Sequence, residues 1–224
     1  MKCKCRCRWR ISPNASKNSN PIHHLHLHHL LLHPVRRGRM GVAGMSYRND
    51  TGLPSPSSVL RPFIDSTWFS EESQARGTAV HDACHSHLLG RYVVLPRAYR
   101  GYFDSFKRWC DAEKPEPVVM ETRLLSHIYG YCGQPDFIGR IKSHAGEGVA
   151  DWKTSAALGK AWALSIAAYR QLYNRHDKPT TWGCSVRLKE DGSFPLVNFY
   201  PAWEVDFNKF LGALNLWRHF NLGQ

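Results

Sequence analysis

The chain has 224 residues, of which 42% are hydrophobic and 21% are charged, so it is long and apolar enough for one domain with a substantial core. Its formal net charge is +12, but residues 1–49 contain ten Lys or Arg and no acidic residue, which leaves 20 basic and 18 acidic residues over 50–224. Net charge therefore gives no ground for classifying the body as a nucleic-acid-binding protein, and any basic surface there must be local.

Cysteine usage and hydropathy indicate the compartment. The number of cysteines is odd, no apolar leader precedes them, and four are scattered through the body: Cys84, Cys110, Cys132 and Cys184. This usage is typical of reduced thiols in the cytoplasm. No apolar stretch approaches the length that a membrane span requires. We therefore expect a soluble cytoplasmic protein that does not engage a membrane.

Residues 1–45 form a basic extension that contains a Cys-x-Cys-x-Cys run and six histidines. This composition predicts no packed core, so we expect a disordered extension, or a stretch upstream of a natural start at Met45. A soft-metal site and an organelle transit peptide are the alternatives. The folded domain is accordingly placed at 46–224.

The first strong periodic pattern predicts a helix over 71–89, because Ser70 is suited to cap it and Gly90 to end it. A short helical or extended piece is expected before it, over 57–64. Aromatic residues at helical spacing predict a second helix over 98–113. The later expected elements are a strand over 118–128 that contains Glu121, a helix that Thr154 or Ser155 caps and that runs to about 175, strands over 181–188 and 194–200, and a last helix over 202–221.

Residues 133–155 are predicted to form a β-hairpin, because two apolar runs flank a polar, glycine-rich turn over 143–148. Asp136 is expected in the first strand. Asp151 and Lys153 are expected in the second strand, two residues apart and therefore on one face. Two carboxylates in a half-buried hairpin require a partner or a metal ion. The hairpin is therefore a candidate site for a divalent cation.

The chemistry of such a site is that of phosphodiester hydrolysis. Hard cations such as Mg²⁺ bind carboxylate oxygens and keep water ligands, and a bound cation lowers the pKa of its water and stabilises developing charge. The spacing allows Asp151 to hold the metal while Lys153 orients the attacking water, with the carbonyl of Trp152 as a further candidate ligand. The imidazole of His81, in the first helix, can complete the site. The alternative is an ordinary surface ion pair, which stabilises a fold little.

The order of these residues along the chain resembles that of a known family. The order is Gly-x-x-x-His at 77–81, Glu121, Gly-x-x-Asp at 133–136, Asp-x-Lys at 151–153 and a later helix with Tyr169. It resembles the RecB-type exonuclease branch of the PD-(D/E)XK nucleases, especially its small phage and prophage members, over about residues 50–200. The resemblance implies an α/β, restriction-endonuclease-like fold, in which helices flank a mixed central sheet, and a Mg²⁺- or Mn²⁺-dependent DNA exonuclease domain over 46–224.

The resemblance also implies a role for each matching residue. Asp136, Asp151 and His81 would be metal ligands, and Lys153 would be the catalytic lysine. Glu121 matches the family's acidic position on the strand that precedes the Gly-x-x-Asp motif.

Candidate contacts to DNA lie on the helix that follows the hairpin and on the surface. The family's last motif, Gln-x-x-x-Tyr, reads Ser165-Ile-Ala-Ala-Tyr169 here, so the two ends of this stretch are candidate contacts without the family's glutamine. Five basic residues are candidates for phosphate contacts, with an ordinary solvated surface as the alternative: Arg123, Arg140, Lys142, Lys160 and Arg170.

Cofactors other than a divalent cation are not expected. Some relatives hold an iron–sulfur cluster with cysteines near the C-terminus, but no cysteine follows Cys184, and no Gly-x-x-x-x-Gly-Lys-Ser/Thr motif for ATP occurs. A zinc site at His81, Cys84 and His85 has helical spacing, but the sequence places no further ligand for it.

Two other functions remain open: a catalytically idle DNA-binding module on the same fold, and an endonuclease of restriction or junction-resolving type. The expected partners are linear DNA ends or single strands, further copies of this chain and, for a phage protein in a bacterial cytoplasm, a single-strand annealing protein. Polarity, strand preference and the choice between Mg²⁺ and Mn²⁺ are not predicted.

Overall fold

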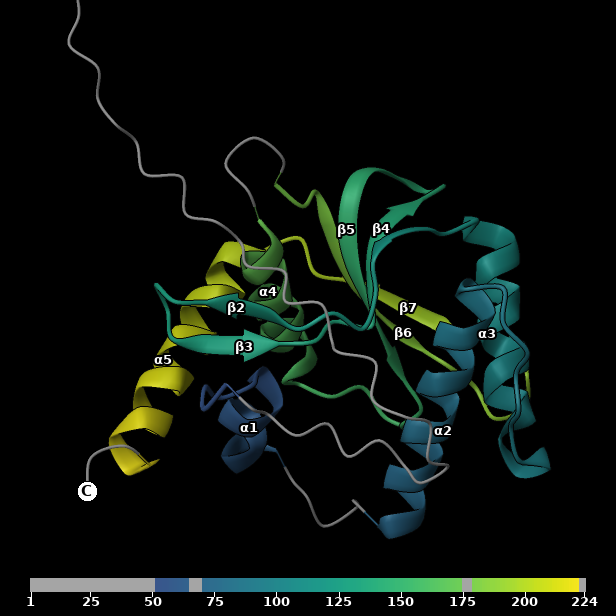
Figure 1. The fold of residues 1–224 in the computed structure, drawn as a ribbon, viewed down its shortest axis with the longest axis horizontal. Coiled ribbons are helices and arrows are strands. Elements are labelled where there is room, and N and C mark those ends of the chain that lie inside the picture. Colours follow the sequence, from purple (N-terminus) through teal and green to yellow (C-terminus); the bar gives the residue numbers. More distant parts are fainter. Residues whose placement is uncertain (1–50, 65–69, 175–178, 222–224) are drawn as a thin grey trace, which may run out of the picture.

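The computed structural model describes residues 51–64, 70–174 and 179–221. The extension predicted over 1–45 lies outside these residues. A five-stranded mixed sheet runs through the centre of the described part in the order β1-β4-β5-β6-β7 (Figure 1). Its strands are β1 (Glu116–Val119), β4 (Phe137–Ile141), β5 (His144–Lys153), β6 (Trp182–Arg187) and β7 (Leu196–Phe199). Only the β5–β6 pair is parallel among these strands, as the helical crossover between them requires.

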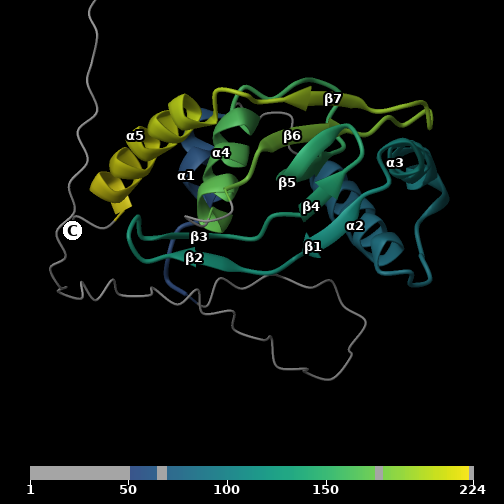
Figure 2. The same cartoon turned by 90° about the horizontal axis from the view of Figure 1, so that it is seen from above.

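Helices cover both faces of the sheet, as Figure 2 shows from above. One face carries α1 (Pro56–Leu60), α4 (Trp162–Tyr173) and α5 (Trp203–Asn221), and the other carries α2 (Glu71–Leu88) and α3 (Arg100–Glu113). The short 3₁₀ helices η1 (Arg61–Phe63) and η2 (Arg97–Tyr99) lead out of α1 and into α3. The prediction of a mixed central sheet flanked by helices is confirmed.

Alternation along β5 divides the interior into two cores. Val149 packs in the core under α1, α4 and α5, whereas Ala150 and Trp152 pack in the core under α2 and α3. Because side chains two residues apart share a face of a strand, Asp151 and Lys153 lie on the α4 side. Within the described residues, no helix is both long enough and apolar enough to cross a membrane.

The predicted hairpin forms, but its turn is shorter than the sequence pattern indicated. Ile141 pairs with His144, so only Lys142 and Ser143 connect the two strands, and the glycine-rich stretch predicted as a turn belongs to β5. Gly148 explains why this stretch pairs, because it faces Trp182 on β6 and leaves room for the indole. Because Gly148 has no side chain, β5 and β6 can approach each other closely at this point.

Two other predicted boundaries were wrong. The strand expected over 118–128 is two strands, β1 and β2 (Leu124–Ser126), and β2 pairs with β3 (Tyr131–Gly133) in a separate hairpin. Glu121, between them, has a φ of +46°, a left-handed conformation that ends a strand. The helix expected from about 155 begins only at Trp162. In the loop before it, Gly159 lies so close to the Trp162 indole that a Cβ would not fit.

Gly148→Ala is expected to lower the free energy of unfolding by about 1–3 kcal/mol, the usual effect of overpacking a core. An added Cβ would lie 2.1 Å from Cδ2 of Trp182. Urea denaturation measures the change, and Gly212→Ala is the matched control, because its Cβ would meet no atom within 4 Å and alanine favours a helix. Equal stability of the Gly148 variant and the wild type would contradict this packing of β5 on β6.

Candidate active site

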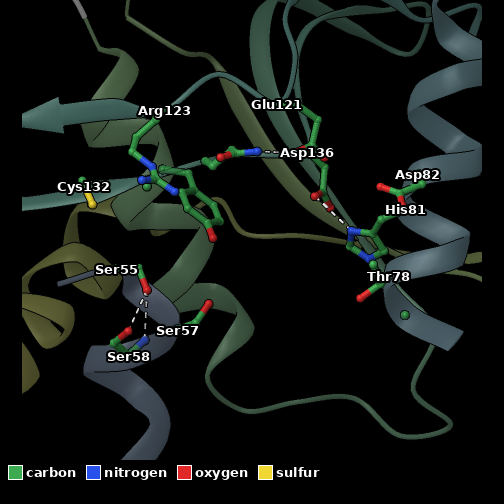
Figure 3. A pocket seen from close by; sticks show the side chains of 14 residues that line it. Ser55, Ser57, Ser58, Thr78, His81, Asp82, Glu121, Arg123, Cys132 and Asp136 are labelled. Carbon is green, nitrogen blue, oxygen red and sulfur yellow. Dashed lines mark hydrogen bonds and ion pairs between the residues drawn. The ribbon is translucent and has the colours of Figure 1, made fainter. Parts of the chain in front are cut away.

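A groove of about 520 Å³ opens between α1, α2 and the start of β4 (Figure 3). In Figure 3, Arg123 and the serines at the start of α1 stand across the groove from His81 and Asp136. Of the residues predicted for the site or for DNA contacts, His81, Glu121, Arg123, Asp136 and Tyr169 line it, whereas Asp151, Trp152 and Lys153 are not among its lining residues.

Asp136 lies one residue before β4 rather than inside it, and its carboxylate joins the two sides of the site. Its side chain is only 8% exposed. Oδ1 lies 3.1 Å from Nδ1 of His81 on α2, and Oδ2 accepts a hydrogen bond of 2.8 Å from the backbone N–H of Trp152 on β5. Both oxygens therefore have protein partners. Figure 3 shows the imidazole and the carboxylate pointing toward each other.

Asp151 and Lys153 share one face of β5, as predicted. Oδ2 of Asp151 and Nζ of Lys153 form an ion pair, and the same oxygen has no hydrogen bond of ordinary geometry within the described residues. The ammonium also lies 5.9 Å from the ring of Trp162 on α4, within the range of a cation–π contact. This pair is too deeply placed for an ordinary surface salt bridge, since Asp151 is only 5% exposed.

The pKa values of the two buried carboxylates are shifted in opposite directions. Burial raises the pKa of Asp151 to about 6, with Lys153 opposing this shift and the charge of Asp136 adding to it. Burial also acts to raise the pKa of Asp136, but the charge and hydrogen bond of His81 hold that pKa below its ordinary value. Two carboxylates compete here for limited positive charge, which is the situation that a divalent cation would relieve.

Nearby carboxylates raise the pKa of both basic groups. Burial acts to lower the pKa of Lys153, but Asp151 and Asp136 raise it above its ordinary value. Burial likewise acts to lower the pKa of His81, and Asp136 more than offsets this, so the pKa is raised. At neutral pH Lys153 is therefore an ammonium, a hydrogen-bond donor and not a base.

Glu121, which has a left-handed backbone conformation, lines the groove. Nε2 of Gln134 donates a hydrogen bond of 2.5 Å to Oε2 of Glu121. Burial raises the pKa of Glu121 to about 7, and the charge of Asp136 adds to the shift. The structure thus brings Glu121 into the electrostatic field of Asp136 and His81.

Of the two predicted DNA contacts on α4, only Tyr169 reaches the groove. Gly133 permits this, because its Cβ would lie 2.8 Å from Cε1 of Tyr169. Burial raises the pKa of Tyr169 well above its ordinary value, so its phenol is a neutral hydrogen-bond donor. Ser165 is not among the lining residues, and its hydroxyl donates to the carbonyl of Ala161 in the same helix.

The predicted phosphate contacts also divide. Arg123 lines the groove, but the prediction for Arg170 was wrong. Arg170 is 2% exposed, and its guanidinium donates to the hydroxyl and carbonyl of Thr180 and stacks on Trp203. The packing of α4 against α5 buries that arginine, which periodicity alone did not reveal. Arg140 is exposed and pairs with Glu147, and Lys142 and Lys160 are exposed in loops.

Two neighbours of the site were not predicted as such. Gln134, the partner of Glu121, occupies a free position within the Gly-x-x-Asp motif. Trp162 lies beside Lys153, with its ring 5.9 Å from the ammonium. No signal in the sequence distinguishes either side chain from ordinary packing.

The carboxylate oxygens of the site are the type of ligand atom that a hard divalent cation prefers. Within the described part of the chain, no group of three or more His, Cys, Asp or Glu side chains stands arranged to hold a metal. This applies to the predicted ligands His81, Asp136 and Asp151 and to the zinc alternative on α2. The described residues nevertheless offer two buried carboxylates, and Oδ2 of Asp151 has the Lys153 ion pair but no hydrogen bond there. Such oxygen donors suit Mg²⁺ or Mn²⁺ rather than a soft metal.

Millimolar Mn²⁺ is expected to raise the thermal unfolding temperature of the wild type by several degrees. A ligand that binds only the native state stabilises it by about 2.7 kcal/mol at a hundred times its Kd, and each kcal/mol is worth roughly 2–4 °C in a domain of this size. Differential scanning fluorimetry should show the shift in the wild type and in Asp111→Asn, but not in Asp136→Asn. A similar shift in all three proteins would place the bound ion elsewhere.

No protein-family model matches the chain, and no curated protein matches it.

Proposed function

We propose that this protein is a divalent-cation-dependent deoxyribonuclease with a restriction-endonuclease-like fold, similar to the RecB-type exonucleases. The observation that supports it is that the Asp136–His81 pair and the Asp151–Lys153 ion pair lie near enough to shift one another's pKa values. These residues come from α2, the start of β4 and β5, which are separated by up to 72 positions in the chain. Packing alone gives no reason to bury two carboxylates and an ammonium beside an imidazole.

The proposed roles follow from the contacts. Asp136 and Asp151 would hold the cation, with the carbonyl of Trp152 and the imidazole of His81 as further ligands. When bound, the cation supplies an activated water and stabilises charge on the phosphate. The Lys153 ammonium donates a hydrogen bond to the attacking water or to a phosphate oxygen, and Asp151 and Trp162 hold the lysine in place. Tyr169 and Arg123 contact the backbone of the strand in the groove, and Glu121 lies close enough to act on the same water network.

One observation favours a second candidate, a catalytically idle DNA-binding module. Both carboxylate oxygens of Asp136 already have protein partners, so a cation must compete with His81 for this residue. DNA binding without cleavage under any divalent cation would support that module.

The test is a nuclease assay on end-labelled linear DNA, single-stranded DNA and covalently closed DNA, with Mg²⁺, Mn²⁺ or EDTA. Progressive shortening of linear molecules and survival of closed circles are the expected result. Cleavage of closed circles would support an endonuclease instead. No cleavage of any substrate in either metal would overturn the proposed activity. Proposed partners are DNA ends or single strands, a further copy of the chain and a single-strand annealing protein in a bacterial cytoplasm.

A further inference from the structure

A second pocket, of about 360 Å³, lies beyond the carboxyl ends of β5 and β6. The polar side chains in its walls are those of Tyr102, Thr154, Ser155, Arg187, Lys189, Glu190 and Asp191. Because β5 and β6 are parallel, their ends meet at one edge of the sheet, where ligands of α/β proteins commonly bind. Lys153 pairs with Arg187 across the two strands, and the N–H of Leu188 donates to the carbonyl of Lys153 at 2.8 Å. The pocket therefore begins one residue past the proposed catalytic lysine.

The wall after β6 is fixed to α3. A Cβ on Gly101 would lie 1.5 Å from the carbonyl oxygen of Glu190, so this turn rests directly on the helix backbone. The hydroxyl of Ser105 accepts from the N–H of Lys189 at 3.1 Å, and Nε of Arg108 donates to the carbonyl of Gly192 at 2.8 Å. These two hydrogen bonds and the close packing at Gly101 hold the wall in place, so the pocket is preformed before any ligand binds.

The two positive groups of this pocket form no close ion pair with any residue that the structure describes, although two carboxylates line the same pocket. Nη1 of Arg187 donates to the carbonyl of Ala156 at 2.9 Å, and no ion pair among the described residues involves Arg187 or Lys189.

Two acids, Glu190 and Asp191, also line the pocket, and each accepts a hydrogen bond. Oε2 of Glu190 accepts from the hydroxyl of Tyr102, and Oδ1 of Asp191 accepts from the N–H of Ser193. The donors that the pocket offers to an anion are therefore the guanidinium of Arg187, the ammonium of Lys189 and the hydroxyls of Thr154 and Ser155, beside two carboxylates that already accept hydrogen bonds.

We propose that this pocket, which begins one residue past Lys153 on β5, binds a phosphate group of nucleic acid. The inference rests on the proposed function, since it places a second phosphate of the substrate next to the reacting one. Guanidinium, ammonium and hydroxyl groups are the usual phosphate donors. The phosphate belongs either to the continuing strand or to a released mononucleotide, and the experiment separates these sources.

Binding is measured in EDTA, so that no cleavage occurs. The probes are deoxythymidine 5′-monophosphate, by calorimetry, and a labelled ten-residue oligodeoxythymidylate without terminal phosphates, by anisotropy. The variants are Lys189→Gln and Arg187→Gln, and the control is Lys107→Gln, an exposed lysine on α3 that pairs with Asp104 at 2.7 Å. Since Arg187 also bonds to Ala156, the Lys189 variant provides a test that does not disturb the loop.

We expect Lys189→Gln to weaken binding about tenfold, the size of one charge-assisted contact. For the oligonucleotide, the slope of log K against log salt should fall by about 0.7, an effect that a structural role would not produce. Weakening of the mononucleotide alone assigns the pocket to the product, and weakening of the oligonucleotide assigns it to the strand. Unchanged affinity for both probes in both variants overturns the inference.

The inference and the proposed activity fail separately. A wild type that cleaves linear DNA while neither variant changes binding retains the nuclease function and loses the phosphate pocket. A wild type that cleaves nothing, but binds phosphate through Lys189, loses the nuclease function and retains the pocket.

Discussion

Asp151→Asn is expected to slow Mg²⁺-dependent hydrolysis of linear DNA by about a thousandfold or more, the scale of losses when a group central to charge stabilisation is removed. Asparagine keeps the shape of the side chain but removes the charge that would hold the cation. Single-turnover cleavage of an end-labelled duplex measures the rate directly, without a contribution from product release.

The matched control is Asp111→Asn on α3. That carboxylate is 83% exposed and pairs only loosely with Lys114, at 3.7 Å, so its loss should leave cleavage within about twofold of the wild type. A wild-type rate in the Asp151 variant would remove Asp151 from the active site. A thousandfold loss in the control would show that the assay reports a general effect of charge removal.

Although its charge is needed for the proposed hydrolysis, Asp151 should destabilise the fold when it ionises as the pH rises. Burial raises its pKa in the folded chain from 3.8 to about 6, so the fold binds its proton more tightly than the unfolded chain does. The stabilisation from this group is complete below pH 3.8 and is lost as pH rises through about 6. In EDTA, the unfolding temperature of the wild type should therefore fall relative to that of Asp151→Asn between pH 4 and 6.5. A difference that stays constant, or that grows in favour of the wild type, would contradict this electrostatic account.

Lys153→Met is expected to slow hydrolysis by about a hundredfold to a thousandfold, as the loss of a hydrogen-bond donor in a charge-stabilising site does. Methionine keeps the apolar stem but not the ammonium. Because Asp151 and Asp136 keep the pKa of Lys153 above its ordinary value, the lysine acts as a cation, and Lys153→Arg should recover part of the rate. Raising the pH should not restore the methionine variant.

The control for this series is Lys209→Met on α5, an exposed lysine that pairs with Asp206 at 3.0 Å. Its rate should match that of the wild type. If the arginine variant were no faster than the methionine variant, the role of Lys153 would depend on its shape or its basicity and not on its positive charge.

Local rules predicted the elements that carry the site. Helix α2 begins after Ser70, whose hydroxyl accepts from the N–H of Ser73, as a cap should. Strand periodicity placed Asp151 and Lys153 on one face, and their ion pair confirms this. These features depend on neighbours within a few residues, which is why the sequence contains enough information to predict them.

Features that depend on distant packing were not predictable from the sequence. The left-handed backbone of Glu121 divides one expected strand into β1 and β2, although glutamate gives no warning of it. Arg170 carries the charge of a surface residue, but α5 covers it and Trp203 receives its guanidinium. The contact between His81 and Asp136 joins residues 55 positions apart, and no local pattern in the sequence fixes such a contact.

A crystal structure of the wild type with Mn²⁺ and a phosphorothioate oligonucleotide, read through the anomalous signal of manganese, tests the central claim most directly. The account predicts a manganese ion bound by the carboxylates of Asp136 and Asp151, with the DNA backbone beside Lys153. Manganese bound only at other residues, or clear density for both carboxylates with no metal at saturating Mn²⁺, would contradict it.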